Sequence, residues 1–233
     1  MNRIDQNKEM TPEEILDYKA QARFCRAYLY WSLLRKFGPV PLLGDEELDQ
    51  TVSYDEMAVP RRPYEECVEF IATEMALAAK DLPLKRDLRT IARPTRGAAL
   101  AVRTKAYLYG ASPLMNGNNS AYASQLVDHE GKRLLPAEYD EARWAKAAAA
   151  ARDVMELNQY DLYVANSRVS GGPDYPATIQ PFDDGEFSKQ NWPNGYADID
   201  PFESYRSVFN GELNAYANPE LIFTRGQNQF SGI

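Results

Sequence analysis

The sequence contains very little histidine and cysteine. Its 233 residues include one histidine, His129, and two cysteines, Cys25 and Cys67. His129 lies in the polar stretch DHEGKR, which leaves little room for a histidine-based triad, and one histidine cannot build a metal site from several histidines. Both cysteines lie inside predicted helices and lack metal-ligand spacing, so we expect buried free thiols rather than disulfides or a zinc site. The residues therefore suggest neither a metal nor another cofactor.

Clustered positive charge and long apolar runs are also missing. The formal net charge is -8, which argues against a nucleic-acid-binding or anionic-membrane surface, because such surfaces need clustered Lys and Arg. No stretch approaches the roughly 20 apolar residues of a membrane span. The opening segment MNRIDQNKEMTPEE lacks the apolar core of a signal peptide. Taken literally, these features predict a soluble chain.

What the sequence does contain is helical periodicity. Thr11 is a candidate N-cap before Pro12, and Gly38 followed by Pro39 is a typical helix end. Four long helices are expected. Three run from about Pro12 to Phe37, Pro63 to Leu82 and Thr95 to Met115, and the fourth runs from the N-cap Asp140 to about Leu157.

The first helix is crowded with large rings, whereas the third and fourth are rich in small residues. The rings are Phe24, Tyr28, Tyr30, Trp31 and Phe37. Because an ordinary surface helix has one apolar stripe, we expect this helix to be covered on more than one side. Alanine-lined helices allow close approach of a neighbour. This exchange of rings against alanines is typical of tetratricopeptide helix pairs, although only the second and third helices follow their spacing of about 34 residues.

After Tyr160 the sequence changes to turn-forming segments such as SGGPDYP and FNGELNAYANP. Thirteen aromatic residues from Tyr160 onward argue against disorder. Leu221 to Thr224 is strand-like. We expect one mainly α domain, in which residues 1–160 form a helical scaffold and residues 161–233 form a long irregular, loop-rich portion packed on it.

Four segments in this order resemble one protein family. They are RAYLYWSLLRKFGPVPLL, RGAALAVRTKAYLYGASPLMNGNN, WAKAAAAARDVMELNQYDLY and ANPELIFTR. Together they resemble the SusD/RagB family of glycan-binding outer-membrane lipoproteins. The resemblance extends from about Arg23 to Arg225, nearly the whole chain.

The resemblance implies a fold, a location and partners. Family members are built on tetratricopeptide-like helix pairs with a loop-rich portion, which would sandwich the first helix. They are tethered at the cell surface by an N-terminal lipidated cysteine, cover a SusC-like TonB-dependent transporter and capture oligosaccharide or polysaccharide for nutrient uptake. This sequence has no cysteine near Met1, since Cys25 lies mid-helix, and it is shorter than full-length members. We therefore expect an internal fragment whose lipid anchor lies outside it.

Sugar binding suits the segment KQNWPNGYADID. Pyranose rings stack on Trp and Tyr, and amide side chains satisfy hydroxyl groups. Trp192 and Tyr196, with Asn191 and Asn194, form the first candidate glycan-binding set, and Tyr175 is a second candidate. The competing interpretation is that these rings anchor the loop to its scaffold.

Two other functions remain open. The chain could be an interaction scaffold of the same complex that binds no sugar. Alternatively, two carboxylates placed across a sugar could act as acid and base in a glycoside hydrolase. We expect no enzyme, because acidic residues in turns commonly have local capping roles. The same side chains could bind calcium, but no EF-hand spacing is present. The carboxylates in question are Asp183, Asp184, Glu186, Asp198, Asp200 and Glu203.

Overall fold

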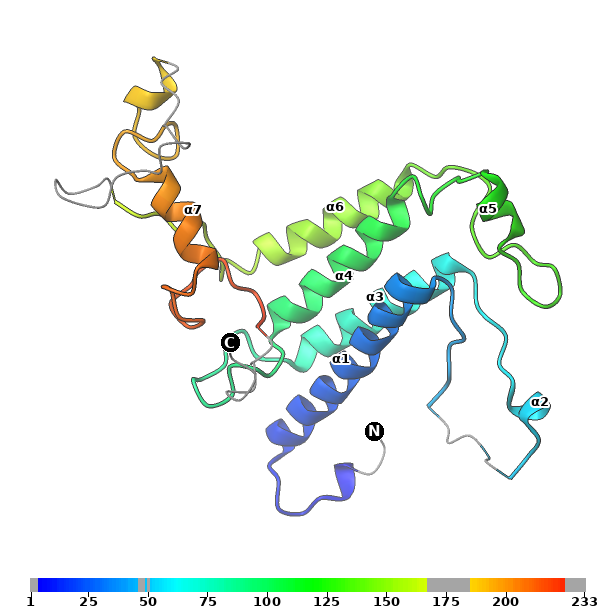
Figure 1. Ribbon diagram of the computed structural model, residues 1–233. Coiled ribbons are helices and arrows are strands. Elements are labelled where there is room, and N and C mark those ends of the chain that lie inside the picture. Colours follow the sequence, from blue (N-terminus) through cyan, green and yellow to red (C-terminus); the bar gives the residue numbers. More distant parts are fainter. Residues whose placement is uncertain (1–3, 46–48, 50, 167–184, 225–233) are drawn as a thin grey trace. The chain divides into compact units, whose positions relative to one another are not determined.

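The computed structural model describes residues 4–45, 49, 51–166 and 185–224. Within these ranges the regular elements are helical and β-pairing is limited to two isolated bridges, so the expected mainly α fold is confirmed (Figure 1). No helix in the described part has the length and apolar character needed to span a membrane. The elements are η1 (Ile4–Gln6), α1 (Pro12–Phe37), α2 (Tyr54–Met57), α3 (Tyr64–Asp81), α4 (Arg96–Ala111), α5 (Ala121–Gln125), α6 (Ala142–Met155), η2 (Phe187–Lys189) and α7 (Pro201–Phe209).

The chain divides into two compact units. Unit 1 contains the helices up to Leu157, and unit 2 covers Asn158–Thr224. The predicted packing of the loop-rich portion on the helical scaffold stays a prediction.

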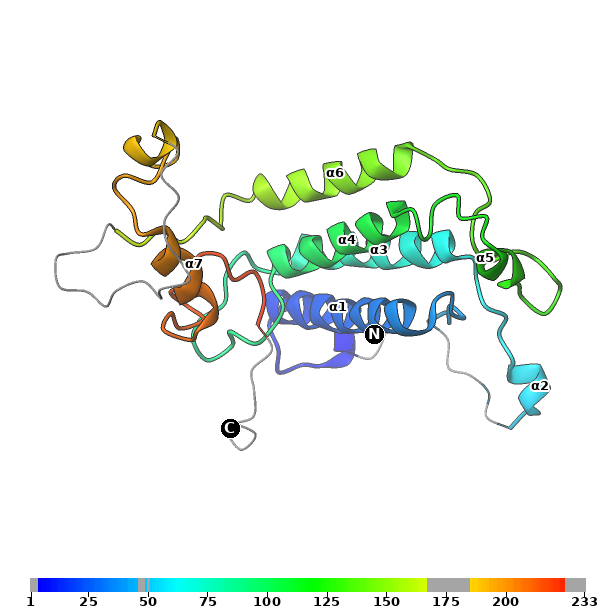
Figure 2. The same cartoon turned by 45° about the horizontal axis from the view of Figure 1, so that its top comes forward.

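Unit 1 is a row of four long helices. Helix α1 packs on α3, α3 packs on α4, and α4 packs on α6. Successive helices in the row run in opposite directions (Figures 1 and 2). This is the arrangement of stacked helix pairs, α1 with α3 and α4 with α6.

The ends of α1 follow from local chemistry. The Thr11 hydroxyl accepts a hydrogen bond from the Glu14 backbone N–H at 3.2 Å, and the Glu14 carboxylate accepts one from the Thr11 backbone N–H at 2.8 Å. This reciprocal pair satisfies two backbone donors at the start of the helix. At the other end Gly38 has a φ of 72°, which favours glycine. Both predicted limits of α1 are confirmed.

Rings and small residues meet in the core of unit 1. Trp31 of α1 packs edge-on against Tyr109 of α4, with ring centroids 4.9 Å apart. Between α3 and α4, a Cβ added at Gly110 would lie 3.3 Å from a methyl group of Val68, so the absence of a side chain there permits the close approach. A small residue thus permits close approach of α3 and α4, while the predicted packing of rings against alanines stays a prediction.

Two sequence-based expectations about burial are wrong. The outer side of α1 is not covered, because Leu29 and Phe37 are 63% and 70% exposed. Helix α1 lies at the end of the row, and its buried residues are those that face its neighbours, including Phe24 and Trp31. Cys25 is also exposed rather than buried.

Cysteine reactivity should therefore differ sharply between the two thiols. Burial raises the pKa of the Cys67 thiol, so less of it is in the reactive thiolate form. Burial also keeps the reagent away from the sulfur. With a thiol-specific chromogenic reagent at neutral pH, we expect one fast equivalent per chain from Cys25 and a second only after denaturant is added. Cys25→Ser should remove the fast phase. Simultaneous reaction of both thiols would contradict this assignment.

Three further expectations need correction in the described residues. The third long helix ends at Ala111 rather than near Met115. Helix α6 begins after Glu141, while the Asp140 carboxylate accepts a hydrogen bond from the Ala142 N–H at 2.9 Å. Residues 221–224 form no strand. The ending at Ala111 agrees with Pro113, because proline cannot continue a helix.

Candidate functional site

Unit 2 is organised around the short extended segment of residues 161–166. Its Asp161 N–H donates to the Pro219 carbonyl, and its Tyr163 N–H donates to the Glu220 carboxylate at 2.9 Å. Its Ala165 carbonyl accepts from the Asp200 N–H at 3.0 Å. Segments distant in sequence are thereby held on this one strip of backbone.

The candidate glycan-binding residues lie in a tight turn after η2. The Asn191 carbonyl accepts hydrogen bonds from the N–H groups of Asn194 and Gly195, and the Gln190 carbonyl accepts one from Ala197. A Cβ at Gly195 would lie only 2.1 Å from the Phe187 carbonyl oxygen, so this close turn requires glycine. The turn has a defined backbone rather than that of a loose loop.

This turn presents an indole ring to solvent. Trp192 is 41% exposed, and its backbone N–H donates to the Asp198 carboxylate at 2.8 Å. Asn191 and Asn194 on either side of it are also exposed. The Trp192–Pro193 peptide bond is cis. The structure thus brings three of the predicted site residues together on one exposed turn.

The remaining two predicted residues differ from these. Tyr196 is half-buried, and its ring packs edge-on against Phe187 with centroids 5.8 Å apart. Part of its ring surface therefore has the anchoring role that the sequence left open. Tyr175 lies outside the described residues.

Three of the carboxylates considered for hydrolysis, Asp198, Asp200 and Glu203, have structural partners. Asp198 accepts from Trp192, and buried Asp200 caps α7 by accepting from the Glu203 N–H at 2.9 Å. Hydrogen bonding from Arg206 lowers the pKa of Glu203. In the described ranges no group of His, Cys, Asp and Glu side chains has an arrangement that could hold a metal ion. Asp183 and Asp184 lie outside these ranges.

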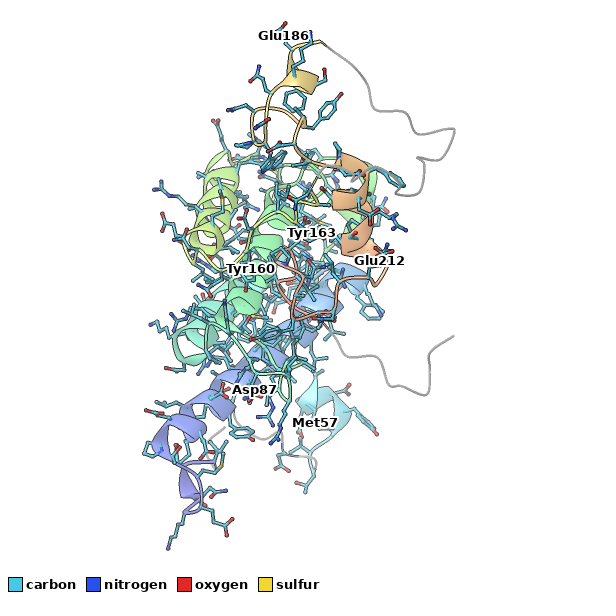
Figure 3. All side chains as sticks on the ribbon, turned by 90° about the vertical axis from the view of Figure 1, so that its left-hand side faces the viewer. Met57, Asp87, Tyr160, Tyr163, Glu186 and Glu212 are labelled. Carbon is cyan, nitrogen blue, oxygen red and sulfur yellow. The ribbon has the colours of Figure 1, made fainter. Side chains whose placement is uncertain are left out.

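Sequence reasoning missed the exposed aromatic pair on α7. Tyr205 and Phe209 are 72% and 71% exposed, and their ring centroids are 5.0 Å apart. The signal available in the sequence was Asp200–Pro201, an N-cap followed by a first-turn proline, with aromatic residues four positions apart. In Figure 3, Glu186 marks the part of unit 2 that contains η2, and Glu212 follows α7 at a separate place.

Unit 1 contains an open polar cleft of about 490 Å³ beside the start of α1 and the end of α3. The Arg86 guanidinium binds the Asp17 carboxylate through two contacts of 2.7 Å. Neither tryptophan nor tyrosine lines this cleft. It therefore lacks the stacking surface that the Trp192 turn offers.

Comparisons with known proteins agree with this architecture. A family model for SusD-like proteins, described as "Starch-binding associating with outer membrane", matches residues 1–108, which include α1, α3 and most of α4. A comparison with curated proteins found no match.

Solved structures extend the likeness beyond the family match. BT4246 is 28% identical to this chain, with a TM-score of 0.59 over 71% of this chain and 30% of its own. A selenomethionine form of BT4246 is 30% identical, with a TM-score of 0.57 over 68% of this chain and 26% of its own. A SusD-like protein from Bacteroides fragilis NCTC 9343 is 22% identical, with a TM-score of 0.47 over 66% of this chain and 23% of its own.

Residues 1–108 match the SusD-like family model, and 71% of the chain resembles the fold of BT4246. The SusD-like fold of this chain combines tetratricopeptide-like helix pairs in unit 1 with an irregular portion in unit 2. The matched part of this SusD-like chain spans less than a third of the length of BT4246.

Proposed function

We propose that this SusD-like chain binds glycan non-enzymatically, through the exposed turn that carries Trp192, Asn191 and Asn194. The observation that carries this proposal is a large ring held open to solvent by a hydrogen-bonded backbone, with exposed amides beside it. The family description of starch binding at the outer membrane supports it.

The chemistry of the turn suits a sugar ring. One face of a pyranose is lined with C–H groups and can stack on the indole, while its rim of hydroxyl groups needs donors and acceptors. Each Asn side chain offers one carbonyl acceptor and two N–H donors. The fixed backbone limits the entropy lost when the sugar binds. Tyr196 supports the turn through Phe187, and Tyr175 is proposed as a further contact.

We place this activity at the cell surface, in a lipid-anchored protein of the outer membrane. There the chain would capture oligosaccharide or polysaccharide for a SusC-like TonB-dependent transporter. The family description of association with the outer membrane supports this location. Deletion of a transporter that is encoded beside the protein containing this chain should abolish glycan uptake. Glycan binding by the isolated chain should be unaffected.

The absence of catalysis is also part of the proposal. A glycosidase needs a general acid whose pKa is raised. At Glu203 the hydrogen bonds from Arg206 shift the pKa in the opposite direction, and Asp200 is used as a helix cap. Incubation with starch or xyloglucan should therefore release no reducing ends. Release that is lost on Asp198→Asn would contradict the proposal.

Trp192→Ala should weaken binding to polysaccharide about thirtyfold, because truncation of a central aromatic contact typically costs about 2 kcal/mol. Affinity electrophoresis through gels containing soluble starch or xyloglucan measures the effect as a change in retardation. Trp144→Ala is a matched control, since Trp144 is 39% exposed on α6 in unit 1 and Trp192 is 41% exposed.

Three results are informative. Loss of retardation in Trp192→Ala alone supports the proposed surface. Equal retardation of both variants and the unmodified chain would show that the sugar binds elsewhere. If the unmodified chain were retarded by no glycan and still co-purified with a transporter, the scaffold alternative would be correct.

A further inference from the structure

Helix α7 leaves two large rings exposed, whereas Phe202 and Val208 on the same helix are partly buried. Its buried residue is Ser207, which is 3% exposed, whereas Tyr205 and Phe209 are more than 70% exposed. Helices of folded proteins normally bury rings and expose serines. Burying the rings would contribute more to folding than burying a hydroxyl group does. Among the described residues, this aromatic pair therefore adds little buried apolar area to the fold.

The pair stands on a rigid support. At the start of α7 the Ser204 hydroxyl donates to the Asp200 carbonyl at 2.6 Å and accepts from the Ala165 N–H at 2.9 Å. Near its end the Asn218 side chain donates to the Val208 carbonyl at 3.3 Å. Both ends of the helix are therefore tied to other parts of unit 2.

The polar side chains of α7 add to this rigidity. Arg206 contacts the carboxylates of Glu203 and Glu212 at 3.0 and 2.9 Å, and Ser207 donates to Glu203 at 2.9 Å. The two rings also contact each other, with an interplanar angle of 53°. A surface fixed in this way before binding loses little conformational entropy when a ligand binds.

The size of the exposed pair distinguishes between classes of partner. Two aromatic side chains present at most about 500 Å² of surface, whereas a stable protein interface buries about 800 Å² on each partner. One or two sugar rings match the smaller area. The Tyr205 hydroxyl and the partly exposed guanidinium of Arg206 supply polar groups beside the rings, as sugar hydroxyls require.

We propose that Tyr205 and Phe209 form a second glycan-contacting surface on unit 2, distinct from the Trp192 turn. This inference rests on the proposed glycan-binding function and extends it to polymeric ligands. A glycan long enough to reach both contacts should bind more tightly than one that reaches a single contact. Once the first contact has formed, the second has a high effective concentration. A short oligosaccharide, which reaches one contact at a time, gains nothing from this effect.

The test compares a double variant, Tyr205→Ala with Phe209→Ala, with the unmodified 233-residue chain. Alanine is the best helix former, and both rings are exposed, so α7 should be retained. We expect about tenfold weaker binding in gels that contain soluble starch or xyloglucan, and a smaller change with maltotriose in solution. Tyr54→Ala is the control, because Tyr54 is 88% exposed on α2 in unit 1.

The outcomes separate this inference from the proposed function. Weaker polysaccharide binding in the α7 variant, with Tyr54→Ala unchanged, supports it. Unchanged binding in the α7 variant, with Trp192→Ala impaired, overturns the second surface and leaves the proposed function intact. If the unmodified chain binds neither polysaccharide, both proposals fail. If the chain is a dimer in solution, the α7 variant is a monomer and glycan binding is unaffected, the rings serve self-association instead and the inference is wrong.

Discussion

Glu74→Ala should lower the free energy of unfolding of unit 1 by about 2 to 3 kcal/mol. Glu74 is only 7% exposed on α3, and its two carboxylate oxygens contact Arg23 and Arg26 of α1, each at 2.7 Å. Arg26 also pairs with Asp45 in the loop after α1 and lies over the ring of Phe70. Removing the central carboxylate leaves two guanidinium groups facing each other without their shared partner.

The expected size follows from the degree of burial. Breaking a fully buried pair costs about 3 to 5 kcal/mol, while exposed pairs contribute about 1 kcal/mol or less. The arginine side chains retain 29% and 26% exposure, so solvent relieves part of the uncompensated charge. Urea unfolding followed by far-ultraviolet circular dichroism measures the difference as a lower midpoint with an unchanged slope.

Glu66→Ala provides the comparison within α3. Glu66 and Arg62 form a pair of 3.7 Å in which both side chains are about half exposed. This variant should therefore cost less than about 1 kcal/mol. Glu74→Gln should lie between the two, because the amide oxygen can still accept one hydrogen bond. Equal midpoints for Glu74→Ala and Glu66→Ala would show that the cluster of Glu74 and its arginines does not join α1 to α3.

The limits of α1 were predictable because they depend on chemistry within a few residues. Thr11, Pro12 and Glu14 determine its start, and Gly38 with Pro39 determines its end. The same holds for the start of α4, where the Thr95 hydroxyl accepts from the Ala98 N–H at 3.2 Å. By contrast, the sequence alone did not show that α1 lies at the end of the row, so it could not reveal the exposure of Leu29.

Helix α7 was missed for a physical reason. It is nine residues long, so periodicity has little length over which to be detected. Two of its rings, Tyr205 and Phe209, are exposed and Ser207 is buried, which departs from the pattern used to find helices. The hydrogen bonds that stabilise it come from distant residues, including Ala165 and Asn218.

In the candidate site, too, the sequence predicts some features and not others. Composition was sufficient to select Trp192 and its neighbouring amides, and the structure places them together on one turn. Composition could not distinguish Trp192, which is exposed to solvent, from Tyr196, which packs on Phe187. That distinction depends on the backbone course around Gly195, where hydrogen bonds and a close approach bring η2 beside the turn.

Ala150→Leu should destabilise unit 1 by about 2 kcal/mol, because the contact between α4 and α6 has no room for a larger side chain. The buried residues of α6 are alanines, Ala147 and Ala150, and Ala150 has no exposed surface. Overpacking at such a position typically costs about 1 to 3 kcal/mol. The facing helix also buries mainly small residues, namely Gly97, Ala98, Ala99, Val102, Ala106, Gly110 and Ala111.

Outward movement of α6 could relieve this clash, but the movement has its own cost. Asp153 of α6 pairs with Arg103 of α4, and Arg143 of α6 contacts Glu65 of α3 at 2.7 Å. A helix that moves away from its neighbours weakens both pairs, so the loss of stability remains whether α6 moves or the core distorts.

Ala148→Leu separates packing from helix propensity. Ala148 is exposed on the same helix, and leucine is nearly as good a helix former as alanine. This control should therefore stay within about 0.5 kcal/mol of the unmodified chain. Urea midpoints for the two variants measure the difference directly. If both leucines were tolerated equally, the alanines of α6 would not be required for close packing, and the pairing of α4 with α6 would need another explanation.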